Sequence, residues 1–153
     1  MDSLEFNPLK MLHLVNCTWA GRCADWAPLV LRLAAGVVFL AHGWQKYQMG
    51  VAGVSGFLSS LGFPAPDIMA VLLIGGEIVG GALLILGLYA RTAAMVTTII
   101  AVVALLTVHV SKGFFISNGG YEFILLLLAT SVSVLITGAG RYSLDKKLKT
   151  GQE

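Results

Sequence analysis

The stretch from Leu72 to Arg91 constrains the fold of this chain more than any other. It reads LLIGGEIVGGALLILGLYAR and holds one carboxylate, Glu77, between two Gly-Gly pairs. About 20 apolar residues in a helix span the ~30 Å hydrocarbon core of a bilayer. The stretch therefore predicts a transmembrane helix over about residues 67–89. A carboxylate in such a helix costs about 2.5 kcal/mol or more on insertion scales, so Glu77 is expected to have a polar partner and a function.

The composition places the whole chain in the membrane. Of its 153 residues, 57% are hydrophobic and 12% are charged, with a mean hydropathy of +0.84. Soluble domains carry about 25% charged residues, so an integral membrane protein of one domain is expected. The net charge of +2 is too small to indicate a nucleic-acid partner. The expected partners are the lipid bilayer and either a protein partner or further copies of the chain.

The hydrophobic runs predict an all-α fold, an antiparallel bundle of four transmembrane helices. The expected spans are about 27–47, 67–89, 91–112 and 121–138, within a transmembrane domain of residues 27–140. Residues 48–65 form a connector with the pattern of a short interfacial helix, stopped by Pro64 and Pro66. Residues 1–26 form an N-terminal arm that either lies on the membrane surface or frays, and residues 141–153 form a basic tail.

Basic residues near the ends of the spans predict the orientation. The side that holds both termini has Lys10, Arg22, Arg91, Arg141, Lys146, Lys147 and Lys149, and the opposite side has Lys46 and Lys112. By the positive-inside rule both termini are cytoplasmic. The acidic start, MDSLEF, does not favour a secretory signal peptide, so we expect the first span to be retained.

Ionisable residues interrupt all four spans and are the candidates for a site. They are Arg32, His42, Lys46, Glu77, His109 and Glu122. At ~1.5 Å per residue, Glu77 falls near the midplane and Arg32 near the cytoplasmic end. The other four fall in the outer leaflet. The pattern predicts a polar pocket open toward the outer leaflet, with Glu77 as its floor.

Glycines predict where the helices approach one another. Gly76 and Gly80 form a small-xxx-small pair, and Gly80 and Gly81 share a face with Glu77. Gly36 lies on the same stripe of the first span as Arg32. These four glycines are expected to be helix-packing positions. His109 shares its predicted face with Val102 and Thr98.

Each candidate also has a purely structural interpretation. Arg32 could extend to the cytoplasmic surface, and the lysines could be interfacial anchors. Glu77 could form a buried pair with Arg32 or a histidine that only fixes the bundle. Glu122 could form an ordinary ion pair with Lys112 or Lys46.

The residue types exclude several kinds of chemistry but do not identify a reaction, so no catalytic residue is assigned. No nucleophile triad or haem-attachment motif is present. The carboxylates and histidines lie on separate spans without an E-x-x-H pair, so no metal site is expected. The spacing of Cys17 and Cys23 fits neither a redox pair nor a zinc site. A pocket that handles protons or holds a membrane ligand such as a quinone fits best.

Several motifs in order resemble the DoxX family of small bacterial four-helix membrane proteins. They are R-x3-G-x5-HGWQK at 32–46, GFLSSLGFPAP, IGGEIVGGALLILGLYAR, His109, Glu122 and GAGRYSLD, where the family often has Gly-Pro-Gly at 138–140. The resemblance covers about residues 28–147. It implies the fold and a bacterial inner-membrane location. It also implies quinone-linked electron transfer beside a partner oxidoreductase, carried by Glu77, His109 and Glu122.

Three functions follow as hypotheses. The first is an accessory or quinone-interacting subunit of a membrane redox system, which makes quinone the expected cofactor. The second is a non-enzymatic assembly factor or structural subunit of a larger complex. The third is a small proton-coupled transporter, which would require oligomerisation because four helices make a narrow path and no inverted repeat is evident.

Overall fold

The computed structural model describes residues 24–150, and over that range it contains helices and no strand. The elements in chain order are η2 (Ala24–Trp26), α3 (Ala27–Ser60), α4 (Pro66–Leu86), α5 (Ala90–Ala104), η3 (Leu105–His109), η4 (Val110–Lys112), η5 (Ile116–Asn118), α6 (Glu122–Thr137) and α7 (Leu144–Thr150). Most of the predicted N-terminal arm, with Cys17 and Cys23, lies outside the described residues.

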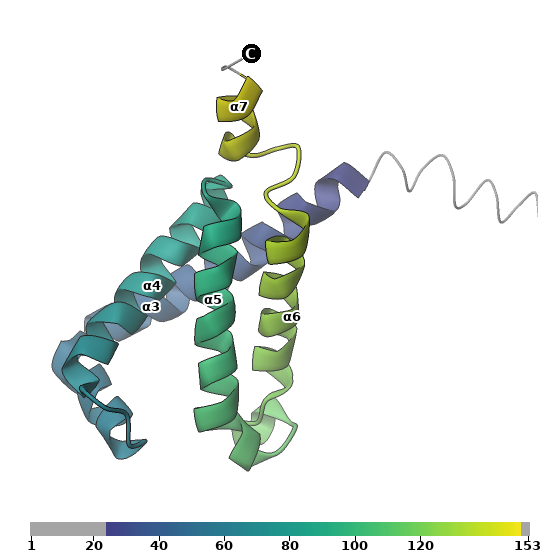
Figure 1. Ribbon diagram of the computed structural model, residues 1–153. Helices are drawn as coiled ribbons and strands as arrows, with labels where there is room; N and C mark the ends of the chain where they lie inside the picture. The colour runs from purple at the N-terminus through teal and green to yellow at the C-terminus, as the bar shows by residue number, and fades with distance from the viewer. Residues whose placement is uncertain (1–23, 151–153) are drawn as a thin grey trace, which may run out of the picture.

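The long helices form an antiparallel bundle. In Figure 1, α3 and α4 run along each other, and α5 and α6 stand side by side. Three helices are long and apolar enough to cross a membrane, those over Ala24–Ser60, Pro66–Leu86 and Ala90–Lys112, and α6 is a shorter apolar helix of 16 residues. The predicted fold class, an all-α bundle of apolar helices, is confirmed.

The first long helix is broken close to the point where the sequence suggested its end. A break after Tyr47 and a separate short helix within residues 48–65 were expected, and α3, which spans 34 residues from Ala27 to Ser60, consists of two helical segments joined by a kink three residues later than expected. Gly50 has a non-helical backbone within it, with φ 78° and ψ 157°, which glycine adopts without a Cβ penalty. Beyond this kink, Val54, Ser55 and Leu58 are buried. The end of α3 is therefore part of the packed bundle.

Two groups of buried side chains hold the helices together. The larger group joins α3, α4, α5 and α6 and consists of Ala35, Phe39, Leu84, Ala93, Ala94, Ala101, Ile124, Leu127 and Val134. The smaller group joins the end of α3 to α4 and consists of Val54, Leu58, Ala70 and Ile74. Large apolar side chains such as Leu72 and Ile136 are exposed on the outside of the bundle, as expected where helices face lipid.

Glycines allow α3 and α4 to approach closely. A Cβ atom at Gly81 would lie 2.6 Å from the backbone nitrogen of Leu40, and one at Gly36 would lie 2.8 Å from the carbonyl oxygen of Gly81. The contact between α4 and α5 is similar, because a Cβ at Gly80 would lie 3.1 Å from Thr97 Cγ2. Small residues at such contacts let van der Waals packing hold helices together in a bilayer.

Candidate functional site

Lys46 and Glu77 form an ion pair between α3 and α4. Lys46 Nζ lies 2.8 Å from both Oε1 and Oε2 of Glu77, and the exposed fractions of the two side chains are 23% and 6%. Gly43 makes the pair possible, since a Cβ there would lie 2.9 Å from Glu77 Cβ. The backbone of α3 thus lies against Glu77, and Lys46, three residues further along, reaches its carboxylate.

The partner of Glu77 differs from the two that the sequence suggested. The carboxylate pairs with Lys46 and with neither Arg32 nor a histidine. The reason is the position of the turn between α3 and α4. Lys46 lies 16 residues before Gly62 in the α3–α4 turn, and Glu77 lies 15 residues after it. Two antiparallel helices that extend to this turn therefore place the two residues at the same depth.

A cavity of about 720 Å³ lies beside this pair. It is lined by the end of α3, by α4, and by α5 together with the η3 turn that follows it. Lys46, Glu77 and His109 are the ionisable residues in its lining. The rest is mainly apolar, with Phe57 and Leu58 from α3, Leu72 and Leu73 from α4, and Ile99 and Ile100 from α5. Leu72 is 61% exposed and Ile99 56% exposed, so the cavity opens between α4 and α5 on the side that faces lipid.

His109 reaches the cavity through an irregular end of the third membrane helix. After α5 the chain forms the π-helical turn η3, and such turns occur frequently at functional sites. His109 Nδ1 lies 2.8 Å from the carbonyl oxygen of Gly119. A carbonyl can only accept a hydrogen bond, so Nδ1 carries the proton. In the neutral ring, Nε2 is then left as a hydrogen-bond acceptor.

The π-helical turn also corrects the predicted face of His109. The α-helical pattern placed it above Val102 and Thr98, but a π turn advances fewer degrees per residue and shifts the register. His109 and Val108 line the cavity, whereas Thr98 and Val102 do not. The Thr98 hydroxyl is buried without a hydrogen-bond partner among the described residues.

Arg32 lies at the other end of the bundle and is not a wall of this cavity. Its exposed fraction is 2%, so it does not extend to the surface either. Its Nη1 donates to the carbonyl oxygens of Leu84 at 3.0 Å and Ile85 at 2.7 Å, and its Nη2 donates to that of Tyr142. Arg32 therefore donates to two carbonyl groups in the last turn of α4, of which that of Leu84 also accepts the Gly87 N–H at 3.2 Å, and ties the tail to this helix end.

Two further candidates, His42 and Glu122, are also absent from the cavity lining. His42 is exposed, and its Nδ1 lies 2.9 Å from the carbonyl oxygen of Val38, one turn earlier. Glu122 Oε1 accepts a hydrogen bond from the backbone N–H of Ile116 at 2.7 Å, which closes the loop before α6. The ion pair considered for Glu122 with Lys112 or Lys46 is not formed among the described residues. Of the six candidates, Lys46, Glu77 and His109 line this cavity, and Lys46 and Glu77 are in direct contact.

Sequence reasoning missed the apolar part of the site. Phe57, Leu58 and Leu61 lie in the connector over residues 48–65, which was expected to form a short interfacial helix. They line the cavity because α3 extends to Ser60. Gly43 was also missed, although its position one turn before Lys46 was a usable signal. Within residues 24–150, no three side chains of the metal-ligating types His, Cys, Asp and Glu converge.

Comparison with known proteins identifies the family. The family model DoxX matches residues 27–110, more than half of the chain. The chain belongs to the DoxX family. The matched range contains α3, α4, α5 and η3, and therefore every residue of the Lys46–Glu77 cavity.

Relatives of this DoxX protein span most of its length. One, from Bacillus subtilis (strain 168), is named "Putative oxidoreductase CatD" and is 33% identical over 125 residues, which cover 82% of this chain and 89% of that protein. "Inner membrane protein YqjF" of Escherichia coli (strain K12) is 31% identical over 134 residues, 81% of this chain and 93% of that protein. "Uncharacterized membrane protein Rv3486" of Mycobacterium tuberculosis is 32% identical over 130 residues, 78% and 80% of the two chains. No solved structure gives a significant match.

Proposed function

We propose that this DoxX protein is the membrane subunit of a redox system and binds a quinone in the cavity beside Lys46 and Glu77. One observation carries the proposal. A cavity that faces lipid is apolar over most of its lining and has an ammonium, a carboxylate and an imidazole among its side chains. The name of the Bacillus subtilis relative, which describes it as an oxidoreductase, supports the same class of function.

The residues present fit a quinone. Its ring oxygens accept hydrogen bonds, which the ammonium of Lys46 and a protonated His109 can donate. Its isoprenoid tail is apolar, as are Phe57, Leu72 and Ile99 in the lining. The volume of about 720 Å³ lies within the usual range of small-molecule sites, roughly 300–1,000 Å³. A lateral opening between helices gives access from the bilayer.

The chain's own groups can hold and move protons at this position. A bound quinone supplies two-electron, two-proton chemistry, with the electrons delivered by a partner oxidoreductase. Lys46 neutralises Glu77, which makes a carboxylate tolerable at this depth. An imidazole is suited to proton exchange near neutral pH. His109 can take up or release a proton at Nε2 while Nδ1 stays bonded to Gly119.

The test is the quinone content of protein purified in mild detergent, measured by solvent extraction and mass spectrometry. We expect wild-type protein to retain quinone, and Glu77→Gln or His109→Leu to lower the retained amount at least fivefold. Lys112→Gln is the matched control, because Lys112 is exposed at the same end of the bundle and does not line the cavity. Absence of quinone from the wild type, or equal retention by all variants, would contradict the proposal.

A structural subunit or assembly factor is the second candidate. The observation in its favour is that both oxygens of Glu77 already have a partner in Lys46. Such a pair can fix the register of two helices without binding a ligand. In that case Glu77→Gln lowers the stability of the protein or the recovery of a partner protein, while quinone content and redox activity stay the same.

A further inference from the structure

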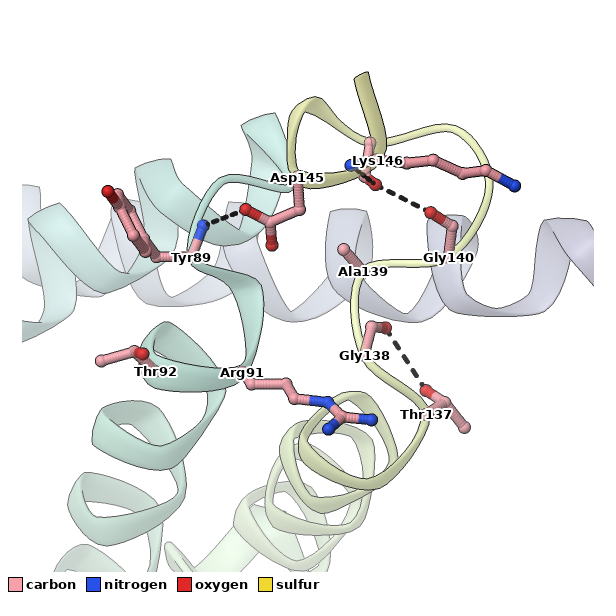
Figure 2. Close-up of a pocket in the computed structure, with 10 residues that line it drawn as sticks. Tyr89, Arg91, Thr92, Thr137, Gly138, Ala139, Gly140, Asp145 and Lys146 are labelled. Atoms are coloured by element: carbon pink, nitrogen blue, oxygen red, sulfur yellow. Dashed lines mark hydrogen bonds between the residues drawn. The ribbon is translucent and has the colours of Figure 1, made fainter. Parts of the chain in front are cut away.

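A second cavity, of about 680 Å³, lies at the opposite end of the bundle, where α4 meets α5 and α6 meets the tail. Figure 2 shows Arg91 extending from α5 toward Gly138, at the end of α6. Among the described residues its guanidinium donates one hydrogen bond, from Nη2 to the carbonyl oxygen of Ile136 at 3.3 Å. The hydroxyl groups of Thr92 and Thr137 lie in the same lining. The cavity thus combines an exposed guanidinium with two hydroxyls, of which that of Thr137 donates to the carbonyl oxygen of Ser133 at 2.7 Å.

The acidic residue in this lining is already engaged. Oδ1 of Asp145 accepts the backbone N–H of Tyr89 at 2.7 Å, and Oδ2 accepts that of Ala90 at 3.0 Å. The carboxylate therefore caps the N-terminal end of α5. A ligand in the cavity would not bind the N–H groups of this helix end, because Asp145 already accepts from them. Lys146 also lines the cavity. In Figure 2 its side chain extends outward, past Gly140.

The cavity lies at the level where the apolar helices end. Leu86 is the last residue of α4, Ala90 the first of α5, and Thr137 the last of α6. Exposed aromatic side chains occupy the same end. The rings of Trp26 and Tyr142 pack at a tilt with their centroids 4.5 Å apart. Tryptophan and tyrosine concentrate at the headgroup level of membranes, so the cavity is at the depth of lipid phosphates.

Exposed apolar side chains follow the residues of this cavity along α5 and α6. Ile136, next to Thr137, is 71% exposed, and Met95, one turn beyond Arg91, is 48% exposed. A ligand with an anionic head and acyl chains matches this arrangement of a basic polar cavity above an exposed apolar surface. Basic pockets between transmembrane helices at the cytoplasmic side bind the headgroups of acidic lipids. A guanidinium forms paired hydrogen bonds with phosphate.

We propose that this cavity binds the phosphate group of an anionic phospholipid, with Arg91 as its main ligand and the acyl chains on Ile136 and Met95. The probe is phosphatidylglycerol added to the full-length protein in neutral detergent, with phosphatidylcholine for comparison, and bound lipid is counted by native mass spectrometry. We expect wild-type protein to prefer phosphatidylglycerol and Arg91→Gln to reduce that preference about fivefold, the usual contribution of one basic residue.

Arg141→Gln is the matched control. Arg141 is exposed at the same end, pairs with Asp25 at 3.2 Å, and does not line the cavity. Thr92→Glu is a second variant that should fold, because a carboxylate in the first turn of α5 favours the helix while it repels a phosphate. The proposal requires loss of the preference in Arg91→Gln and Thr92→Glu and its retention in Arg141→Gln. It is overturned by equal binding of the two lipids, by equal loss in Arg141→Gln, or by displacement of the lipid with millimolar inorganic phosphate, which would indicate a site for a soluble anion.

Discussion

Lys46 Nζ lies 2.8 Å from both carboxylate oxygens of Glu77 and joins α3 to α4 among apolar side chains. Removing one member of such a pair leaves an uncompensated charge, which typically costs about 3–5 kcal/mol in a buried site. The 23% exposure of Lys46 reduces the expected cost of Lys46→Leu to about 2–3 kcal/mol. The measurement is the free energy of unfolding of wild-type protein and of Lys46→Leu in a denaturing-detergent titration.

The double variant Lys46→Leu with Glu77→Leu tests whether the unpaired charge is the cause of the lost stability. Two apolar residues of similar volume leave no buried charge, so the double variant should recover most of the lost stability. If it is less stable than both single variants, the pair contributes packing or a bound ligand that leucine does not replace.

Two glycines of α4 should respond in opposite ways to the same substitution. Gly81→Ala places a methyl group 2.6 Å from the Leu40 backbone, and overpacking of this kind costs about 1–3 kcal/mol. A methyl group added at Gly75 would meet no neighbouring helix or side chain within 4 Å, so Gly75→Ala should be neutral or stabilise the helix by about 0.5–1 kcal/mol. Thermal unfolding of the two variants side by side is the measurement. A similar melting temperature for both would contradict close contact between α3 and α4.

Filling the cavity should remove a bound quinone without unfolding the protein. Gly75 lines the cavity and has open space beside it, so Gly75→Phe projects a ring into the ligand volume with little strain. Gly56→Phe is the control, because Gly56 also has open space but does not line the cavity. Extracted quinone should fall at least fivefold in Gly75→Phe and stay constant in Gly56→Phe. Equal quinone content in the two variants would place the ligand elsewhere.

The attachment of the tail should weaken when the Arg32 contacts are removed. Arg32 donates to Leu84, Ile85 and Tyr142, and a Cβ at Gly87 would lie 2.5 Å from Arg32 Nη1 on a backbone with φ +65°. Both Arg32→Leu and Gly87→Ala should therefore expose the backbone around Lys146 to trypsin several times faster. Gly113→Ala is a control at the other end of the bundle, with φ +81° and open space. Cleavage at the wild-type rate in Arg32→Leu would show that other contacts hold the tail.

Hydrophobic pattern was enough to predict an all-helical membrane bundle, because the length and composition of each run are local properties. It was also enough to select Glu77, since a carboxylate in a hydrocarbon run is costly wherever the helix lies. Its partner was not predictable in the same way. Counting residues placed Lys46 in the outer leaflet and Glu77 near the midplane, whereas the packing of α3 against α4 brings the two side chains together.

Three of the six predicted residues line the cavity beside Glu77 and three do not, for a similar reason. Depth along a helix follows from counting residues, but the direction of a side chain depends on the helical register and on which helix lies opposite. The π-helical turn η3 changes the register before His109. Glu122 lies at the expected end of the bundle, yet its carboxylate binds the backbone of Ile116.

The sequence by itself determined that this chain crosses a membrane as apolar helices, that it resembles the DoxX family, and that Glu77 needs a partner. Only the tertiary structure decided that the partner is Lys46, that Arg32 binds carbonyl groups at the other end, and that the end of α3 lines the cavity. The physical reason is that the free-energy cost of placing a charged side chain in the membrane depends on that residue and its own helix, which the sequence shows directly. Pairing depends on the approach of two helices, which Gly43 and Gly81 set through contacts between residues far apart in sequence.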